Sequence, residues 1–138
     1  TSYSCKKDKT DYTETDKQII LDYIASRHLT AKSTSSGLYY VIEKTGSDHR
    51  PTIYSTVTVS YTGRLSNDTV FDGTASGSSA TFALTSVIAG WQEGIPLFGI
   101  GGKGKLLVPS ALGYGSTSSY GIPANSVLIF DIELVDFY

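Results

Sequence analysis

The spacing of apolar residues changes along the chain from a helical period to a strand period. The helical period comes first and predicts an amphipathic helix from about Thr15 to His28. Its apolar face consists of four residues: Ile19, Ile20, Tyr23 and Ile24. Thr13, with Asp16 three positions later, gives a weak capping signal at the start of this helix. The apolar face must be covered, either by the rest of the chain or by a second copy.

From Gly37 onward the pattern is that of β-strands. The segment STVTVSYTGRL, residues 55–65, alternates apolar and hydroxyl-bearing side chains, and the last segment, VLIFDIELVDF at 127–137, also alternates. In the last strand four residues are expected to face inward: Leu128, Phe130, Ile132 and Leu134. Further strands are predicted at residues 37–44, 70–71, 79–85 and 104–109.

One short helix is predicted among these strands, at residues 86–95. Its apolar face carries four residues at helical spacing: Val87, Ile88, Trp91 and Ile95. Thr85 or Ser86 suits the N-cap, and Pro96 marks the end. Trp91, the only tryptophan, is then either an ordinary core residue or the floor of a pocket, with the missing side chain of Gly90 beside it.

These elements predict an α+β fold in which the short helix covers one face of an antiparallel sheet. The Ser/Thr-rich stretch at 30–37 is typical of a linker. Residues 1 to about 12 are typical of a flexible polar tail. We therefore divide the chain into a tail with the amphipathic helix, residues 1–36, and a β-rich domain, residues 37–138. A chain of 138 residues is long enough for one such domain.

Composition and charge exclude several classes of function. The formal net charge is −2 and no basic stripe is present that would neutralise phosphates, so no nucleic-acid partner is expected. The single cysteine allows no intrachain disulfide and argues against a zinc site. His28 and His49 stand in no triad or ligand spacing, so no metal, cofactor or catalytic triad is expected.

The sequence GIGGKG, Gly99 to Gly104, matches a dinucleotide-binding fingerprint by its letters alone. Such a motif needs a strand before the glycines and a helix after them, because the phosphate binds at the helix N-terminus. Here a helix precedes the glycines and a strand follows them. They are therefore predicted to form a tight connection between helix and strand.

The N-terminal sequence TSYSCKKDKTD has small residues before Cys5 and a charged stretch after it. It resembles the junction of bacterial lipoproteins, in which a signal peptide is removed just before a cysteine that receives the lipid. This resemblance implies a longer precursor, a membrane tether through a lipid on Cys5, and a periplasm-facing position in a bacterial cell envelope. The alternative is that Cys5 is one residue of a disordered tail.

Five motifs stand in order along the chain: VSYTGRL, TVFDGT, VIAGWQEGI, GKGKLLVPSALGYG and GIPANSVLIFDIEL. Together they resemble the FKBP-type peptidyl-prolyl cis-trans isomerases, the immunophilins that bind macrolide immunosuppressants. The resemblance covers about residues 37–138. It implies an antiparallel sheet of about five strands wrapped round one short helix, with the active pocket between them and Trp91 as its floor.

The resemblance also implies roles for individual residues. Three are catalytic by this reading: Asp72 as the pocket carboxylate, Ile88 through its backbone N–H, and Tyr114 through its hydroxyl. The substrate-binding set is Tyr61, Phe71, Phe82, Val87, Trp91, Ile122 and Phe130. The implied ligands are proline-containing polypeptides and macrolide inhibitors, with no cofactor and no metal.

Some positions depart from the family pattern. An aromatic often found two residues before Phe82 is replaced by Ala80, and the loop STSSYGIP lacks the usual histidine, with Ser119 or Tyr120 near its place. By the resemblance, these departures are expected to affect substrate preference and macrolide affinity more than activity itself.

Three functions remain open from the sequence. The first is a prolyl isomerase that assists protein folding. The second is a module that grips a proline-containing segment in the same pocket without turnover. The third is a chaperone or dimer that uses the apolar face from Ile19 to Ile24 to hold clients or a second subunit.

Overall fold

The computed structural model describes residues 11–138, so Cys5 and most of the predicted tail lie outside the described residues. The helices are α2 (Thr13–Ser26) and α3 (Ala89–Gly94), with short 3-10 turns η1 (Leu84–Ser86), η2 (Ile95–Leu97) and η3 (Ser110–Leu112). The strands are β1 (Lys32–Ser33), β2 (Tyr39–Lys44), β3 (Thr56–Leu65), β4 (Val70–Gly73), β5 (Ala80–Ala83), β6 (Lys103–Val108) and β7 (Leu128–Phe137).

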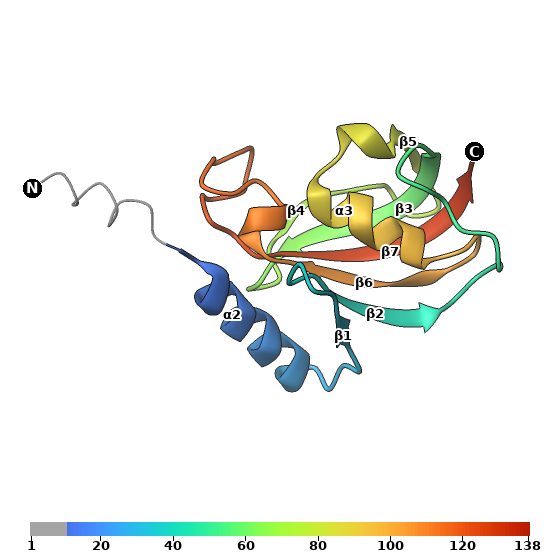
Figure 1. Cartoon of the computed structure of the whole chain (residues 1–138). Coiled ribbons are helices and arrows are strands. Elements are labelled where there is room, and N and C mark those ends of the chain that lie inside the picture. Colours follow the sequence, from blue (N-terminus) through green and yellow to red (C-terminus); the bar gives the residue numbers. More distant parts are fainter. Residues whose placement is uncertain (1–10) are drawn as a thin grey trace, which may run out of the picture.

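The strands of residues 11–138 form one seven-stranded sheet in the order β1-β2-β6-β7-β3-β4, and β5 also pairs with β3. All of its strand pairs are antiparallel. Helix α3 lies against one face of the sheet and α2 lies on the other side of it (Figure 1). The predicted α+β class, with an antiparallel sheet wrapped round one short helix and an additional N-terminal helix, is confirmed.

The main core lies between α3 and the sheet, and the alternation of β3 and β7 supplies much of it. Strands β3 and β7 pair over their whole length, from Val57 opposite Phe137 to Leu65 opposite Leu128. The four residues expected to face inward from β7 are all buried: Leu128, Phe130, Ile132 and Leu134. Ile95 and Phe98, next to α3, are fully buried against them and close this core from the helix side.

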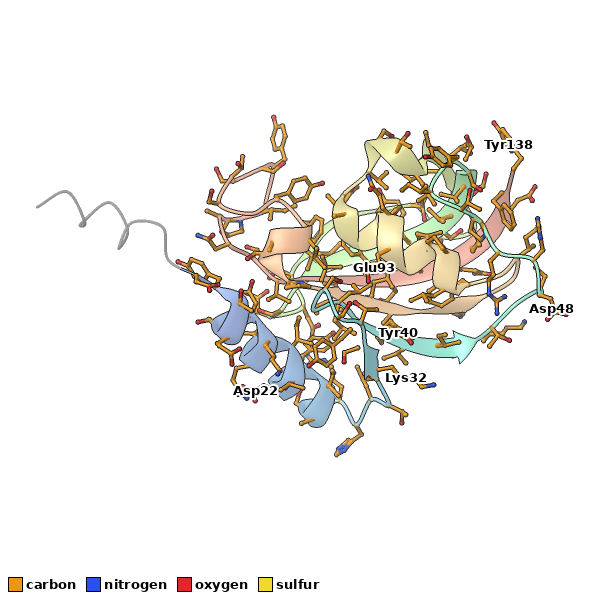
Figure 2. All side chains as sticks on the ribbon, in the orientation of Figure 1. Asp22, Lys32, Tyr40, Asp48, Glu93 and Tyr138 are labelled. Carbon is orange, nitrogen blue, oxygen red and sulfur yellow. The ribbon has the colours of Figure 1, made fainter. Side chains whose placement is uncertain are left out.

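A second core forms between α2 and the opposite face of the sheet. Ile20 and Tyr23 are buried there, and they pack against Val41, Leu107 and Ile129. The apolar face of the helix is therefore covered by the chain's own sheet. Asp22 lies on the outer side of α2 and is exposed (Figure 2), as an amphipathic helix requires.

The two ends of α2 are attached to loops of the domain. At its C-terminal end, the Tyr23 hydroxyl donates a hydrogen bond to Asp68 Oδ1 at 2.9 Å, and Arg27 forms an ion pair with the same carboxylate. At its N-terminal end, Asp16 accepts hydrogen bonds from Ser110. Helix α2 thus contacts the β3–β4 turn at one end and the segment after β6 at the other.

Several local predictions differ from the structure. Helix α2 has Tyr12 at its N-cap without a side-chain capping bond, so the Thr13–Asp16 capping signal is wrong: Asp16 turns into the interior instead. Helix α3 begins at Ala89 with Ile88 as N-cap, not at residue 86, because Val87 and Ile88 are extended after η1. Strand β1 lies within the predicted linker.

Two glycines let α3 approach the sheet closely. A Cβ added at Gly90 would lie 2.6 Å from Val108 Cγ1, and one added at Gly94 would lie 2.6 Å from Leu106 Cδ2. Both glycines therefore face β6, four residues apart on one side of the helix. The missing side chain of Gly90 serves this helix–sheet contact rather than opening a pocket, and it fixes the depth at which Trp91 sits.

The glycine-rich stretch after η2 connects helix to strand, as predicted. Gly101 adopts φ +84°, a conformation that favours glycine, and β6 begins at Lys103. Since a strand and not a helix follows the glycines, they present no helix N-terminus for a phosphate.

Candidate functional site

A cavity of about 270 Å³ opens between α3 and the face of the sheet that α3 covers. Its walls consist of ten residues: Tyr61, Phe71, Asp72, Phe82, Ser86, Val87, Ile88, Trp91, Tyr114 and Phe130. Every catalytic or substrate-binding residue implied by the resemblance is among them except Ile122. They come from β3, β4, β5, the η1–α3 segment, the loop after β6, and β7, so that distant parts of the chain meet at one place.

Trp91 forms the centre of the aromatic wall. Its ring lies edge-to-face against Tyr61, Phe82 and Phe130, with centroid distances of 5.0, 5.5 and 5.3 Å and interplanar angles between 82° and 89°. The side chain is 4% exposed and belongs to the main core cluster. Trp91 is therefore both a core residue and a wall of the cavity. Its indole N–H is buried and has no hydrogen-bond partner among residues 11–138.

Tyr61 and Asp72 form the polar pair at the mouth of the cavity. The Tyr61 hydroxyl donates to Asp72 Oδ2 at 2.9 Å, and the Gly73 backbone N–H donates to the other carboxylate oxygen at 2.8 Å. Burial, together with the hydrogen bond to Asp72 and the nearby charges of Asp72 and Tyr114, raises the pKa of Tyr61 from 10.0 to about 12. Tyr61 is therefore a neutral hydrogen-bond donor at physiological pH.

The raised pKa predicts a late-titrating phenol. Because the folded-state pKa exceeds the ordinary value, the contribution of neutral Tyr61 to stability is complete below pH 10 and is lost as pH rises through about 12. Ultraviolet titration of wild type against Tyr61→Phe should show that the missing phenol ionises near pH 12. In Asp72→Ala the pKa of Tyr61 should move back toward 10.0, since the acceptor is gone. If the phenol that is present in wild type and absent from Tyr61→Phe ionised near pH 10, the Tyr61–Asp72 geometry would be contradicted.

Ile88 and Tyr114 bring two hydrogen-bond donors to the rim. The Ile88 carbonyl accepts the N–H groups of Trp91 and Gln92 at the start of α3, whereas its own N–H meets no acceptor within residues 11–138. Tyr114 is 42% exposed and lies between Gly113 and Gly115 in the loop after η3. Both donors are available to a ligand carbonyl.

Ile122 does not line the cavity. It is 5% exposed and packs within the main core, while Ser119 and Ile122 exchange backbone hydrogen bonds of 2.9 Å that close the loop. Its side chain therefore supports the loop from within. Ile122 was expected in the substrate-binding set but is not among the cavity walls, and its role in binding stays a prediction.

Gly63 shapes the wall and was not among the site residues expected from the sequence. A Cβ at this position would lie 2.7 Å from Phe71 Cζ and 3.0 Å from Phe130 Cε1. Gly63 is opposite Asp72 in the β3–β4 pair and opposite Phe130 in the β3–β7 pair. The sequence does indicate this position, because a glycine inside a strongly alternating strand often marks a place where another group approaches the backbone closely.

Two larger hollows have a different character. One of about 540 Å³ lies at the start of α2 beside residues 33–37, and one of about 670 Å³ lies over the charged side chains of β6 and β7. Hydroxyl-bearing and charged residues are prominent in the lining of both, whereas the smaller cavity has five aromatic rings in its walls beside Tyr114. An apolar ring of a ligand therefore fits the smaller cavity best.

The fold and the cavity define a class of protein: an antiparallel sheet wrapped round a short helix, with an aromatic pocket between them. The sequence pattern of the FKBP-type peptidyl-prolyl cis-trans isomerases matches residues 47–135. The chain belongs to this family.

Relatives agree with this assignment. The chain is 48% identical over 105 residues to the FKBP-type peptidyl-prolyl cis-trans isomerase FkpA of Aeromonas hydrophila, and 42% identical over 106 residues to FkpA of Escherichia coli. These alignments cover 75% and 76% of this chain and 39% of each relative, so the chain spans well under half of their length.

Solved structures agree as well. The crystal structure of FkpA from Escherichia coli matches with a TM-score of 0.82 and 35% identity, covering 99% of this chain and 63% of that one. A peptidyl-prolyl cis-trans isomerase from Pseudomonas syringae matches with a TM-score of 0.76 and 28% identity, covering 93% of this chain and 98% of that one.

Proposed function

We propose that this domain catalyses cis-trans isomerisation of X–Pro bonds in polypeptides and so assists protein folding. The observation that carries the proposal is the aromatic cavity in front of Trp91, in a chain that belongs to the FKBP-type family. A proline ring matches this cavity in size and polarity, and the neighbouring carbonyls of the polypeptide would then lie at the rim.

The chemistry needs no nucleophile. Rotation about an X–Pro bond must overcome about 18–20 kcal/mol of amide resonance, which makes the uncatalysed step take about tens to hundreds of seconds. The twisted transition state has lost that resonance and carries less separated charge than the planar amide. A pocket that excludes water therefore disfavours the planar form relative to the twisted one, and catalysis is differential binding of the twisted form.

The proposed roles follow from where each group lies. The rings of Tyr61, Phe82 and Trp91 would hold the proline ring, and the Ile88 N–H and Tyr114 hydroxyl would donate to the flanking carbonyls. The hydrogen bond from Tyr61 fixes Asp72 at the mouth of the cavity, where the carboxylate would orient the Tyr61 ring rather than transfer a proton.

Replacement of Tyr114 by phenylalanine tests this assignment. Loss of one hydrogen bond to the substrate should lower kcat/KM by about five- to tenfold, the ratio that corresponds to the net value of such a bond. The measurement is the cis-to-trans rate of short X–Pro peptides with and without protein. Tyr120→Phe, at a fully exposed tyrosine of the same loop, is the matched control and should leave the rate unchanged.

A folded wild-type domain that accelerates no X–Pro peptide, whatever residue precedes proline, would overturn the isomerase proposal. Peptide binding at the cavity without acceleration would instead favour the non-catalytic module that the sequence left open. Macrolide inhibitors are a further ligand class that the family suggests. Ala80 on β5 is the position to vary in a test of macrolide affinity, because it replaces an aromatic residue that family members often have two positions before Phe82.

The membrane tether through Cys5 remains a proposal that concerns residues outside the described part. Within residues 11–138 no helix is long and apolar enough to cross a bilayer. The relatives named above come from bacteria, which is compatible with a lipid on Cys5 and a position in a cell envelope. A gene sequence with an apolar signal segment that ends just before Cys5 would support the tether. A native protein whose mass, measured by mass spectrometry, includes no lipid would contradict it.

A further inference from the structure

We propose that Asp16 of α2 is a positioning residue for Tyr114, acting through Ser110. The inference deepens the proposed function and rests on it, because Tyr114 matters as a donor at the isomerase pocket. Asp16 and Ser110 are 94 residues apart in the chain, and both are buried, with 1% and 4% exposed surface. The loop after β6 lies beside the start of α2 (Figure 1).

A single carboxylate oxygen of Asp16 holds Ser110. Asp16 Oδ2 accepts the Ser110 backbone N–H at 2.9 Å and the Ser110 hydroxyl at 2.5 Å. A carboxylate that accepts two donors in a buried site is a strong and directional anchor. It fixes Ser110 at the point where the chain leaves β6 and turns into η3.

Ser110 in turn holds both neighbours of Tyr114. Its carbonyl accepts the Gly113 N–H at 3.0 Å and the Gly115 N–H at 2.8 Å. These two glycines flank Tyr114 directly, and Gly115 adopts φ +60°. Four hydrogen bonds therefore converge on Ser110, two from the loop that presents Tyr114 and two to the helix.

The other oxygen of Asp16 indicates that the contact is not explained by stability alone. Asp16 Oδ1 is buried and has no hydrogen-bond partner within residues 11–138. A buried carboxylate with one unpartnered oxygen costs stability compared with an apolar residue of similar size. Ile20 and Tyr23 already hold α2 against the sheet by their packing. The carboxylate of Asp16 is therefore not needed to dock the helix, and its contribution is to attach the loop that carries Tyr114.

Amide hydrogen exchange of the intact chain tests the inference without reference to activity. In Asp16→Ala, the Gly113 and Gly115 amides should exchange about tenfold faster, the ratio expected for loss of about one hydrogen bond. Asp16→Asn keeps an acceptor oxygen and should restore most of the protection. Ile20→Val is the control, because it loosens α2 against the sheet at an apolar side chain of the second core and leaves the carboxylate of Asp16 in place.

Kinetics of paired variants then separate positioning from a general structural effect. Asp16→Ala should lower kcat/KM by about five- to tenfold in the wild-type background and have little further effect in Tyr114→Phe, since both changes remove the same bond to substrate. An equal loss in both backgrounds would overturn the inference. Unchanged exchange at Gly113 and Gly115 would overturn it even in an active enzyme, and faster exchange in a domain without isomerase activity would refute the proposed function alone.

Discussion

Replacing Trp91 by alanine is expected to lower kcat/KM for X–Pro isomerisation by at least about a hundredfold, equivalent to about 2.7 kcal/mol of transition-state stabilisation. The indole provides the edge-to-face contacts that orient Tyr61, Phe82 and Phe130. Its removal would leave a hole at the bottom of the cavity that admits water. Water restores the advantage of the planar amide, which is the state that the dry pocket disfavours.

The same substitution should destabilise the domain by about 3–5 kcal/mol, as large-to-small changes of buried aromatics do. Phe98→Ala is therefore the matched control. Phe98 is fully buried in the same core and does not line the cavity. The Phe98→Ala domain should therefore lose a comparable free energy of unfolding, while its folded molecules keep the wild-type kcat/KM.

Circular dichroism would establish the temperature at which both variants are folded, and isomerisation would be measured there. Trp91→Leu, which keeps apolar volume, gives a second variant if Trp91→Ala does not fold. Folded Trp91 variants with wild-type kcat/KM would contradict the assignment of the pocket.

Replacing Gly63 by alanine should cost about 1–3 kcal/mol of stability, the range for overpacking a filled core. The new methyl group would meet the rings of Phe71 and Phe130, which stand against other aromatics and have little room to move. Displacing two walls at once should also lower kcat/KM by about tenfold or more, because small misplacements of binding groups reduce rates strongly.

A compensating change sharpens this prediction. Phe71→Leu removes the ring atom nearest to the added methyl group, so the double variant Gly63→Ala/Phe71→Leu should regain part of the stability lost by Gly63→Ala. The readout is the denaturation midpoint, because Phe71→Leu itself alters the cavity wall. Strictly additive losses in the double variant would mean that the cost of Gly63→Ala does not come from the Phe71 ring.

The sequence was informative wherever a property repeats locally. Alternation located β3 and β7 and the inward side of β7, and the helical period located α2 with its apolar face, each within two residues. The ordered motifs indicated the family. The resemblance to that family named all but one of the residues found in the cavity walls. These successes share a cause: side-chain periodicity and short motifs are set by neighbours in the chain.

Local rules failed where a residue's partner is distant in the chain. Thr13 and Asp16 looked like a helix cap, but Asp16 is drawn into the interior by Ser110. Nothing in the alternation of β7 indicates that Ile129 is buried as fully as Leu128, since only the docking of α2 covers its side of the sheet.

The amino-acid sequence by itself therefore determined the elements, the fold class and the residue types of the pocket. Only the tertiary structure decided which groups meet: Gly63 beneath two aromatic rings, the Tyr61 hydroxyl on Asp72, and α2 behind the loop that carries Tyr114. The physical reason is that burial and hydrogen-bond geometry depend on how finished elements pack against one another. A hydrogen bond across 94 residues leaves no periodic trace in the chain that forms it.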